Sequence, residues 1–288
     1  MKILFISRYS WPHVGGVEKH IREVSLRLRK KGHKVTIISE NDIKYPHIKY
    51  IGLLYIWLWL FKNRDLIARS DLVHIHDVFI WYLPFRFLFP NKKVYTTFHG
   101  GQGIWPIPFY HKILARLAWR LSRGTVAVGD FIPKYFKIKP DKVVYGAADS
   151  CRKTNRKKEK SVIFLGRLEK ETGVYEFLKW IRSLVYGYKV DFIGDGSLKK
   201  QCEEHGTVHG FCDPAPFLRK AEICVPGGYL SFLEAKTAGC KIKTFYNSPI
   251  KKDYWRAIKK KYSVSENGKK IPTWDDMVNI YLKLWGLY

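Results

Sequence analysis

Short apolar runs alternate with longer mixed segments along the whole chain. In the first half the runs cover residues 2–7, 34–39, 71–77, 93–100 and 124–130, and they are rich in β-branched and aromatic residues. The segments between them are long enough for helices. This alternation predicts a parallel sheet with right-handed crossovers and helices on both faces, the doubly wound α/β class.

A second alternation begins at Ser161. The runs in SVIFLG, KVDFIGDG and EICVPGG each stop at glycine and pass into a helical pattern. Parallel strands deliver their carboxyl ends to a ligand crevice in this way. We therefore expect a second doubly wound sheet with a ligand site at these glycines.

The two alternations predict two domains. Residues 149–160, DSCRKTNRKKEK, contain almost no apolar side chain and indicate an exposed linker. We expect a Rossmann-like domain over 1–148 and a second over 161–265. Residues 266–288 contain a helix capped by Thr273, which we expect to pack back on the first domain. The 288 residues suit two domains of about 150 residues or fewer.

The net charge of the chain limits the classes of binding partner. Lys and Arg number 52 against 25 Asp and Glu, which leaves a net charge of +27. Such an excess favours nucleic acid, an anionic membrane or a phosphorylated substrate, with a solvated lysine-rich surface as the plain alternative. A nucleic-acid-binding protein is the weakest of these, because the aromatic residues cluster in apolar runs and do not form a base-stacking pattern.

The number and spacing of the cysteines bear on the cellular compartment of the protein. Five cysteines, odd in number and scattered, fit reduced thiols in a cytoplasmic protein. MKILFIS runs directly into a polar loop, so we do not expect a secretory signal. Cys202, His205, His209 and Cys212 could be drawn as a zinc site, but their gaps match no common structural zinc pattern. We expect their placement to be incidental.

A glycine turn follows the first apolar run. Gly15 and Gly16 have no side chains, so backbone N–H groups there could approach a phosphate or an acceptor. The alternative is a tight turn that is packed closely for its own sake. An amphipathic helix through Ile21, Val24 and Leu28 follows in either case.

Histidines end two of the other runs. His99 closes the run over 93–100 and precedes a glycine-rich loop, and this placement favours a functional role. His74, His76 and Asp77 close the run over 71–77. Packing would explain these three residues equally well.

Three motifs of the second half, together with the Gly15 turn and His99, carry a family resemblance. They are Gly166-Arg167-Leu168, Gly194-Asp195-Gly196 and Leu233-Glu234-Ala235. In this order they resemble the retaining family-4 glycosyltransferases of the GT-B fold. The resemblance implies two Rossmann-like domains that face a central cleft, and an enzyme that moves a sugar from a nucleotide-sugar to a hydroxyl acceptor.

The same resemblance implies roles for single residues. Arg167 would bind the donor diphosphate with Lys170, since a guanidinium can hold two phosphate oxygens. Glu234 would accept hydrogen bonds from the ribose, and His99 would lie near the transferred sugar. UDP- and GDP-linked donors both fit, and we expect neither a cofactor nor a metal. The other donor-side residues are Gly15, Gly16, Gly194, Asp195, Gly196 and Phe211.

Two positions depart from the family pattern. Pro226 stands where the family has a glutamate, and Thr172 stands where it has a lysine. One lost charge-assisted phosphate contact costs about 1.5–3 kcal/mol, so activity survives one loss more easily than two. A degenerate nucleotide-sugar-binding or regulatory subunit therefore remains an alternative to an active enzyme.

Residues 51–61, IGLLYIWLWLF, suggest the acceptor. Eleven apolar residues are too few for a bilayer span, which needs about 20. They could instead lie in the interface, with Trp57 and Trp59 at headgroup depth and Lys62 and Arg64 on anionic lipid. A buried helix is the alternative. Because relatives glycosylate lipid-linked acceptors, we expect a lipid-linked or membrane-associated acceptor and a peripheral protein on the cytoplasmic membrane face.

Overall fold

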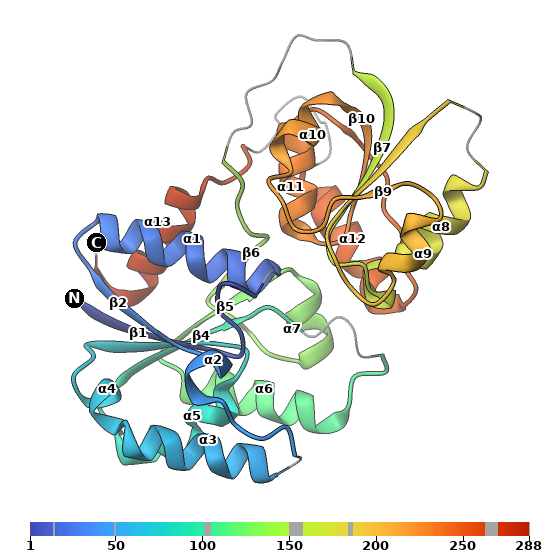
Figure 1. Ribbon diagram of the computed structural model, residues 1–288. Coiled ribbons are helices and arrows are strands. Elements are labelled where there is room, and N and C mark those ends of the chain that lie inside the picture. The colour runs from blue at the N-terminus through green and yellow to red at the C-terminus, as the bar shows by residue number, and fades with distance from the viewer. Residues whose placement is uncertain are drawn as a thin grey trace. The chain divides into compact units, whose positions relative to one another are not determined.

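The computed structural model describes residues 1–13, 15–48, 50–100, 105–149, 158–183, 187–262 and 270–287 (Figure 1). The chain divides into one unit formed by Met1–Val144 with Val278–Tyr288, and another formed by Tyr145–Met277. The boundary at Val144 lies a few residues before the expected position 148.

The apolar runs of the first half form a parallel sheet. Among the described residues it has six strands, in the order β2-β1-β3-β4-β5-β6. The strands are β1 (Lys2–Ser7), β2 (Lys34–Ile38), β3 (Leu72–His76), β4 (Lys93–Phe98), β5 (Gly124–Val128) and β6 (Lys142–Val144). Every residue of β3 is buried, His74 and His76 included, so both faces of this strand are covered.

Helices cover both faces of this sheet (Figure 1). On one face lie α1 (Gly16–Lys30) and α13 (Trp274–Trp285), and on the other lie α3 (Ile51–Lys62), α5 (Phe79–Leu88) and α6 (Phe109–Leu121). The shorter helices of the unit are α2 (Glu40–Ile43), α4 (Arg64–Ala68) and α7 (Phe131–Phe136). The apolar stripe of α1 is buried as its periodicity predicts.

The second half also forms a parallel sheet. Its described strands number five, in the order β11-β10-β7-β8-β9. They are β7 (Glu159–Leu165), β8 (Lys189–Ile193), β9 (Thr207–Val208), β10 (Ala221–Pro226) and β11 (Lys241–Ile242). Its helices are the 3-10 turn η1 (Lys170–Thr172), α8 (Val174–Ile181), α9 (Lys199–Glu203), α10 (Ala215–Lys220), α11 (Tyr229–Thr237) and α12 (Pro249–Tyr262). Two such sheets confirm the doubly wound, GT-B-like prediction.

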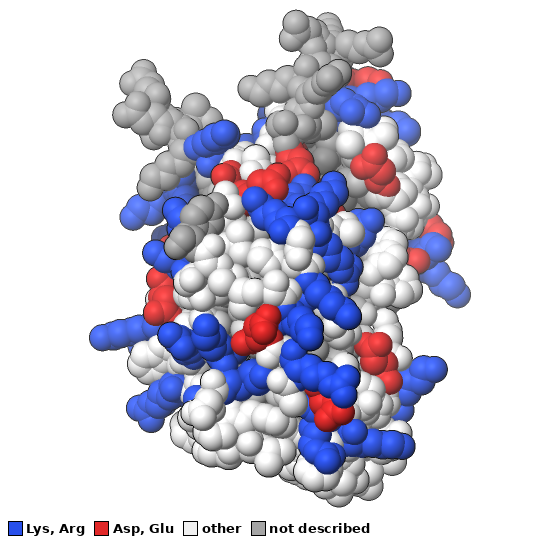
Figure 2. Space-filling model, turned by 90° about the vertical axis from the view of Figure 1, so that its left-hand side faces the viewer, with Lys and Arg blue, Asp and Glu red and all other residues white. Residues whose placement is uncertain are grey.

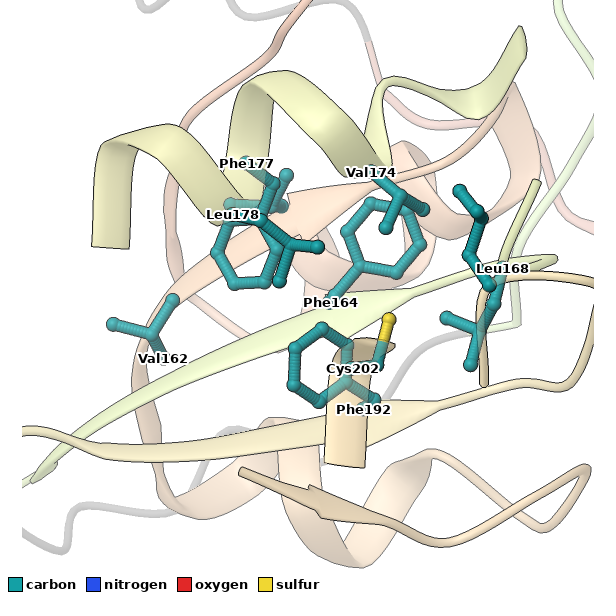
Figure 3. Close-up of a cluster of buried hydrophobic side chains, with 10 residues drawn as sticks. Val162, Phe164, Leu168, Val174, Phe177, Leu178, Phe192 and Cys202 are labelled. Atoms are coloured by element: carbon teal, nitrogen blue, oxygen red, sulfur yellow. The ribbon is translucent and has the colours of Figure 1, made fainter. Parts of the chain in front are cut away.

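Alternate residues of β7 divide the core of this unit in two. Phe164 points toward α8 and packs with Phe177 and Phe192 in one cluster (Figure 3). Ile163 and Leu165 belong to the other cluster, which includes side chains of α10 and α11. Because successive side chains of a strand point to opposite faces, β7 is held from both sides and its carboxyl end is firmly placed.

Glycine turns at the ends of β7 and β8 touch through their backbones. Gly194 has a φ of +152°, and a Cβ at this position would collide with the carbonyl oxygen of Gly166. The Gly166 N–H donates to the Ile193 carbonyl at 3.0 Å, and the Leu168 N–H donates to the Asp195 carbonyl at 2.9 Å. Only glycine tolerates both this backbone conformation and this contact.

We expect Gly194→Ala to lower the free energy of unfolding by at least about 1–3 kcal/mol, because it adds strain and a backbone collision. Denaturant unfolding would measure the loss. Gly239→Ala is the matched control, since Gly239 has a φ of +73° but open space around its Cβ position. Equal losses in the two variants would show that the collision contributes nothing.

Candidate functional site

Buried histidines gather at the carboxyl ends of β3 and β4 in the first unit. His74 and His76 end β3, His99 follows β4, and His20 reaches them from α1. The rings of His20 and His99 are 5.2 Å apart, and those of His74 and His76 are 5.0 Å apart. The sequence predicts the strand-end placement of His74, His76 and His99 but not their meeting with His20.

Helix α13 completes this histidine cluster. Trp285 Nε1 donates to His74 Nδ1 at 3.1 Å, and His74 Nε2 contacts Thr97 Oγ1 at 2.7 Å. The Tyr281 hydroxyl is 2.9 Å from Thr97 Oγ1 and 2.8 Å from His20 Nε2. Because an indole can only donate, His74 Nδ1 must accept, and the proton of this neutral imidazole lies on Nε2.

His99 is held on both its ring and its backbone. Its Nε2 is 3.1 Å from His76 Nδ1, and its N–H donates to Asp77 Oδ1 at 2.8 Å. Burial lowers the pKa of His99 to about 3 and raises the pKa of Asp77 to about 6. His99 is therefore a neutral imidazole at pH 7, which can donate or accept one hydrogen bond but cannot supply a cation.

The glycine turn before α1 is occupied by a side chain of its own helix. Gly15 is the N-cap, and the place of a Cβ there is taken by the carboxylate of Glu18. The same carboxylate pairs with His13 Nδ1 at 3.0 Å. Gly16 has open space around its Cβ position. An internal anion thus already lies at this helix N-terminus, where negative charge is favourable.

In the second unit Arg167 lies on the loop after β7. Its side chain is 48% exposed and pairs with Glu171 at 3.4 Å. Thr172 is buried, and its single hydroxyl proton is shared between the carbonyls of Arg167 and Glu169. Lys170 is exposed, and its carbonyl accepts from Asn247. Thr172 therefore shapes the turn, while Arg167 and Lys170 present charge to solvent.

The other predicted donor-side residues of this unit follow β8 and β9 or lie on α11. Gly194 forms an isolated antiparallel bridge with Gly210, the residue that precedes Phe211. Phe211 is exposed. Glu234 lies in the second turn of α11, since that helix begins at Tyr229, and it is half-buried.

Lys251 is a residue of this region that the motifs did not indicate. It lies on α12 and is buried, and its Nζ donates to the Gly227 carbonyl at 3.0 Å. The periodicity of α12 offered a signal, because Lys251 falls on the same stripe as the buried Trp255, Ile258 and Tyr262. A lysine on an apolar stripe indicates a function or a buried partner.

The four residues of the zinc alternative have separate environments. Cys202 is buried in the apolar cluster of β7 and α8, and Cys212 is exposed. His209 pairs with Asp191 at 2.6 Å, while His205 contacts Arg182. Within the described residues no group of His, Cys, Asp and Glu side chains is arranged to hold a metal. The structure thus does not support the zinc alternative.

Helix α3 exposes one apolar face and buries the other. Ile51, Leu54, Tyr55, Leu58 and Phe61 are exposed, whereas Ile56 and Leu60 are buried. Trp57 and Trp59 are half-buried, and Trp57 Nε1 donates to the Ile80 carbonyl at 3.0 Å. The exposed face therefore excludes the two tryptophans that the sequence suggested. Through the described part of the chain, no helix has the length and hydrophobicity of a membrane span.

One family model matches part of this chain, and several solved structures share its fold. Residues 14–134 match the family described as Glycosyltransferase Family 4. No curated protein matches the sequence. HepE from Anabaena, solved with UDP-glucose, matches with a TM-score of 0.67 and 14% identity over 98% of this chain and 89% of that chain.

Two further structures have the same architecture. The catalytic domain of starch synthase IV from Arabidopsis thaliana, bound to ADP and acarbose, gives a TM-score of 0.61 and 12% identity over 99% of this chain and 98% of that chain. WaaG, a glycosyltransferase of lipopolysaccharide biosynthesis, gives a TM-score of 0.59 and 14% identity over 84% of this chain and 80% of that chain. At these identities the likeness establishes the fold.

We expect the buried histidines to make the protein acid-sensitive. Burial lowers the pKa of His20, His74 and His76 well below 6.5 and that of His99 to about 3. Below pH 6.5 the unfolded chain therefore binds protons that the folded chain does not. As the pH is lowered, the free energy of unfolding should therefore decrease by up to about 1.4 kcal/mol per pH unit for each histidine. Urea unfolding between pH 7.5 and 5.5 would measure the slope.

Asp77 acts in the opposite sense below about pH 6, because its raised pKa lets the folded state take up its proton first. The control is His47→Gln, which removes an exposed histidine and should leave the slope unchanged. An unfolding midpoint that stays constant from pH 7.5 to 5.5 would contradict the expectation.

Proposed function

We propose that this chain is a nucleotide-sugar glycosyltransferase, because residues 14–134 match the model of Glycosyltransferase Family 4. Its donor would be a UDP-sugar and its acceptor a hydroxyl group at a membrane surface. UDP-glucose is the first donor to test, since HepE from Anabaena has been solved with it. We further propose transfer with retention at the anomeric carbon and without a metal, as the family resemblance implies.

The arrangement around Arg167 carries the donor proposal. The glycine turns after β7 and β8 pack backbone against backbone, which holds the loop of Arg167 against the end of β8. The half-exposed ion pair of Arg167 with Glu171 contributes only about 0–1 kcal/mol. A charge-assisted hydrogen bond to phosphate contributes about 1.5–3 kcal/mol, so Arg167 can exchange its partner for a diphosphate at a net gain.

The chemistry that follows is stabilisation of a leaving group. Sugar transfer expels a nucleoside diphosphate, and a fixed cation that faces the growing negative charge lowers the barrier. Glu234 would accept hydrogen bonds from the ribose hydroxyls. His99, neutral at pH 7, would orient a sugar hydroxyl and would not act as a nucleophile, while the leaving phosphate takes the acceptor proton.

A nucleotide-binding subunit without turnover is the second candidate. Two observations favour it. Pro226 is buried as the last residue of β10, opposite Leu165, so it cannot replace a carboxylate that contacts the donor sugar. Thr172 is fully engaged in the turn after Arg167. Turnover distinguishes this candidate from an enzyme, because both would bind the nucleotide.

We expect wild type to release UDP from UDP-glucose and to gain thermal stability with UDP. Saturation at about 100 times the dissociation constant adds roughly 2.7 kcal/mol to the free energy of unfolding. Arg167→Ala should weaken UDP binding at least about tenfold and slow UDP release, because it removes a charge-assisted phosphate contact. Calorimetric titration and a coupled assay for UDP would measure both.

Arg182→Ala is the matched control, since Arg182 is also exposed but lies at the C-terminal end of α8, toward the opposite edge of the sheet. Binding of UDP without any release, from several UDP- and GDP-sugars, would favour the subunit without turnover. If no nucleoside diphosphate stabilises the wild type, the donor proposal fails.

The exposed face of α3 carries the membrane part of the proposal. Its apolar residues recur at 51, 54, 55, 58 and 61, the spacing of one helix face. Lys62 and Arg64 are exposed directly after them, and the Arg64 guanidinium lies 5.0 Å from the centre of the Phe61 ring. An interfacial helix has this combination of apolar face and flanking cations.

The charge of the chain supports an anionic surface as the partner. Lys and Arg are scattered over the face shown in Figure 2, with acidic side chains among them. Each cation near an anionic bilayer contributes about 1 kcal/mol, and this contribution fades within a Debye length of about 8 Å. Only cations beside the apolar face, such as Lys62 and Arg64, would therefore add strongly to membrane binding.

We expect the protein to sediment with liposomes that contain anionic lipid, and more weakly as salt rises. Leu54→Ser combined with Leu58→Ser should reduce binding without lowering the melting temperature, because the two side chains are 54% and 60% exposed. Leu26→Ser, on α1 and on the other face of the sheet, is the control. Equal binding by the double variant and wild type would rule out α3 as the docking surface.

A further inference from the structure

Helix α12 carries a lysine where its pattern calls for an apolar residue. Lys251 is 3% exposed and shares the buried stripe with Trp255 and Tyr262. Lysines are almost never this buried unless their charge has a partner, because removal of an ammonium from water is expensive. The ammonium is therefore expected to lie among polar or charged groups.

The ammonium of Lys251 lies at the carboxyl edge of the second sheet. Its Nζ donates to the carbonyl of Gly227 at 3.0 Å, and the Gly227 N–H donates to the Leu165 carbonyl at 2.8 Å. Gly227 packs directly on Gly166, since a Cβ at position 166 would lie 2.9 Å from the Gly227 Cα. Arg167 is the next residue along the chain. A cation from α12 and a cation from the β7 loop thus approach the same strand ends.

Aromatic contacts fix Lys251 in this place. Nζ lies 4.5 Å from the ring centre of Tyr254 and 5.0 Å from that of Trp255. The Tyr254 hydroxyl in turn accepts the N–H of Tyr229, the first residue of α11, at 2.5 Å, and the two tyrosine rings stack at 3.6 Å. Helix α12 is therefore pinned to the start of α11, and its lysine cannot swing away into solvent.

Burial and the charge of Arg167 disfavour the charged form of Lys251, and Glu171 favours it. Burial, and then the charge of Arg167, lower the pKa of Lys251 to about 7, while Glu171 acts in the opposite direction. An anion that contacts both groups would offset this repulsion. The geometry calls for a group with several oxygens, because Arg167 and Lys251 reach the strand ends from different elements.

We propose that Lys251 supplies the second cation for the donor diphosphate, a role that the buried Thr172 cannot fill. This inference rests on the proposed donor site around Arg167. The exposed Lys170 lies on the same turn as Thr172, but its side chain has no buried position that would hold it toward the strand ends. Lys251 is already fixed there before any ligand arrives, so its contact costs little ordering entropy.

The test compares UDP with uridine, which lacks the phosphates. Lys251→Met keeps an unbranched side chain only one atom shorter and removes its charge, so it should weaken UDP binding about tenfold to a hundredfold and leave uridine binding unchanged. Lys251→Arg should retain most of the UDP affinity. Lys252→Met is the control, because Lys252 is the neighbouring exposed lysine on α12. Calorimetric titration gives the affinities, and thermal melts establish that each variant folds.

Each result has one interpretation. If wild type binds UDP and Lys251→Met binds it equally well, the role of Lys251 is overturned while the donor proposal stands. If Lys251→Met weakens the binding of UDP and of uridine by the same factor, the lysine supports the shape of the site and does not contact phosphate. This result also overturns the inference. If wild type binds neither UDP nor GDP, the proposed function itself fails. Should Lys251→Met not fold, Lys251→Gln offers the same comparison.

Discussion

Contact between the backbones of Gly166, Gly194 and Gly227 is the constraint on which the second unit depends. A side chain at Gly194 would overlap the Gly166 carbonyl, and one at Gly166 would press on Gly227. Because these positions have none, the backbones at the ends of β7, β8 and β10 lie directly against one another. Arg167, the next residue after Gly166, is held at this junction with its side chain half-exposed. The charge chemistry proposed for this unit depends on that placement.

The two units carry different chemical groups at their strand ends. The second unit brings cations there, Arg167 from a loop and Lys251 from α12. The first unit gathers imidazoles that burial keeps neutral, with Tyr281 and Trp285 of α13 as their hydrogen-bond partners. In a sugar transfer the leaving diphosphate needs positive charge, whereas sugar hydroxyls are best held by neutral donors and acceptors.

Departures from the family pattern are compensated by other elements. Thr172 has become a turn residue whose hydroxyl bonds two carbonyls, so the turn keeps its shape without the expected lysine. The strand end at Pro226 leads at once into the glycines before α11, and Tyr254 bonds the first N–H of that helix. Helix α12, which lies later in the chain, thus holds the start of α11 beside this strand end.

The amino-acid pattern determined the two sheets, because buried parallel strands require continuous apolar runs and their turns require glycine. It also placed His99, Arg167 and Gly194 at strand ends, since each directly follows such a run. Contacts between distant elements were decided only by the tertiary structure. His20 and Tyr281 meet at the histidine cluster, and Lys251 reaches Gly227, through packing that no local spacing encodes. For the same reason the exposed face of α3 differs from the expected one. An apolar helix has no polar stripe to mark its outer side, so contacts such as that of Trp57 with Ile80 decide which residues face solvent.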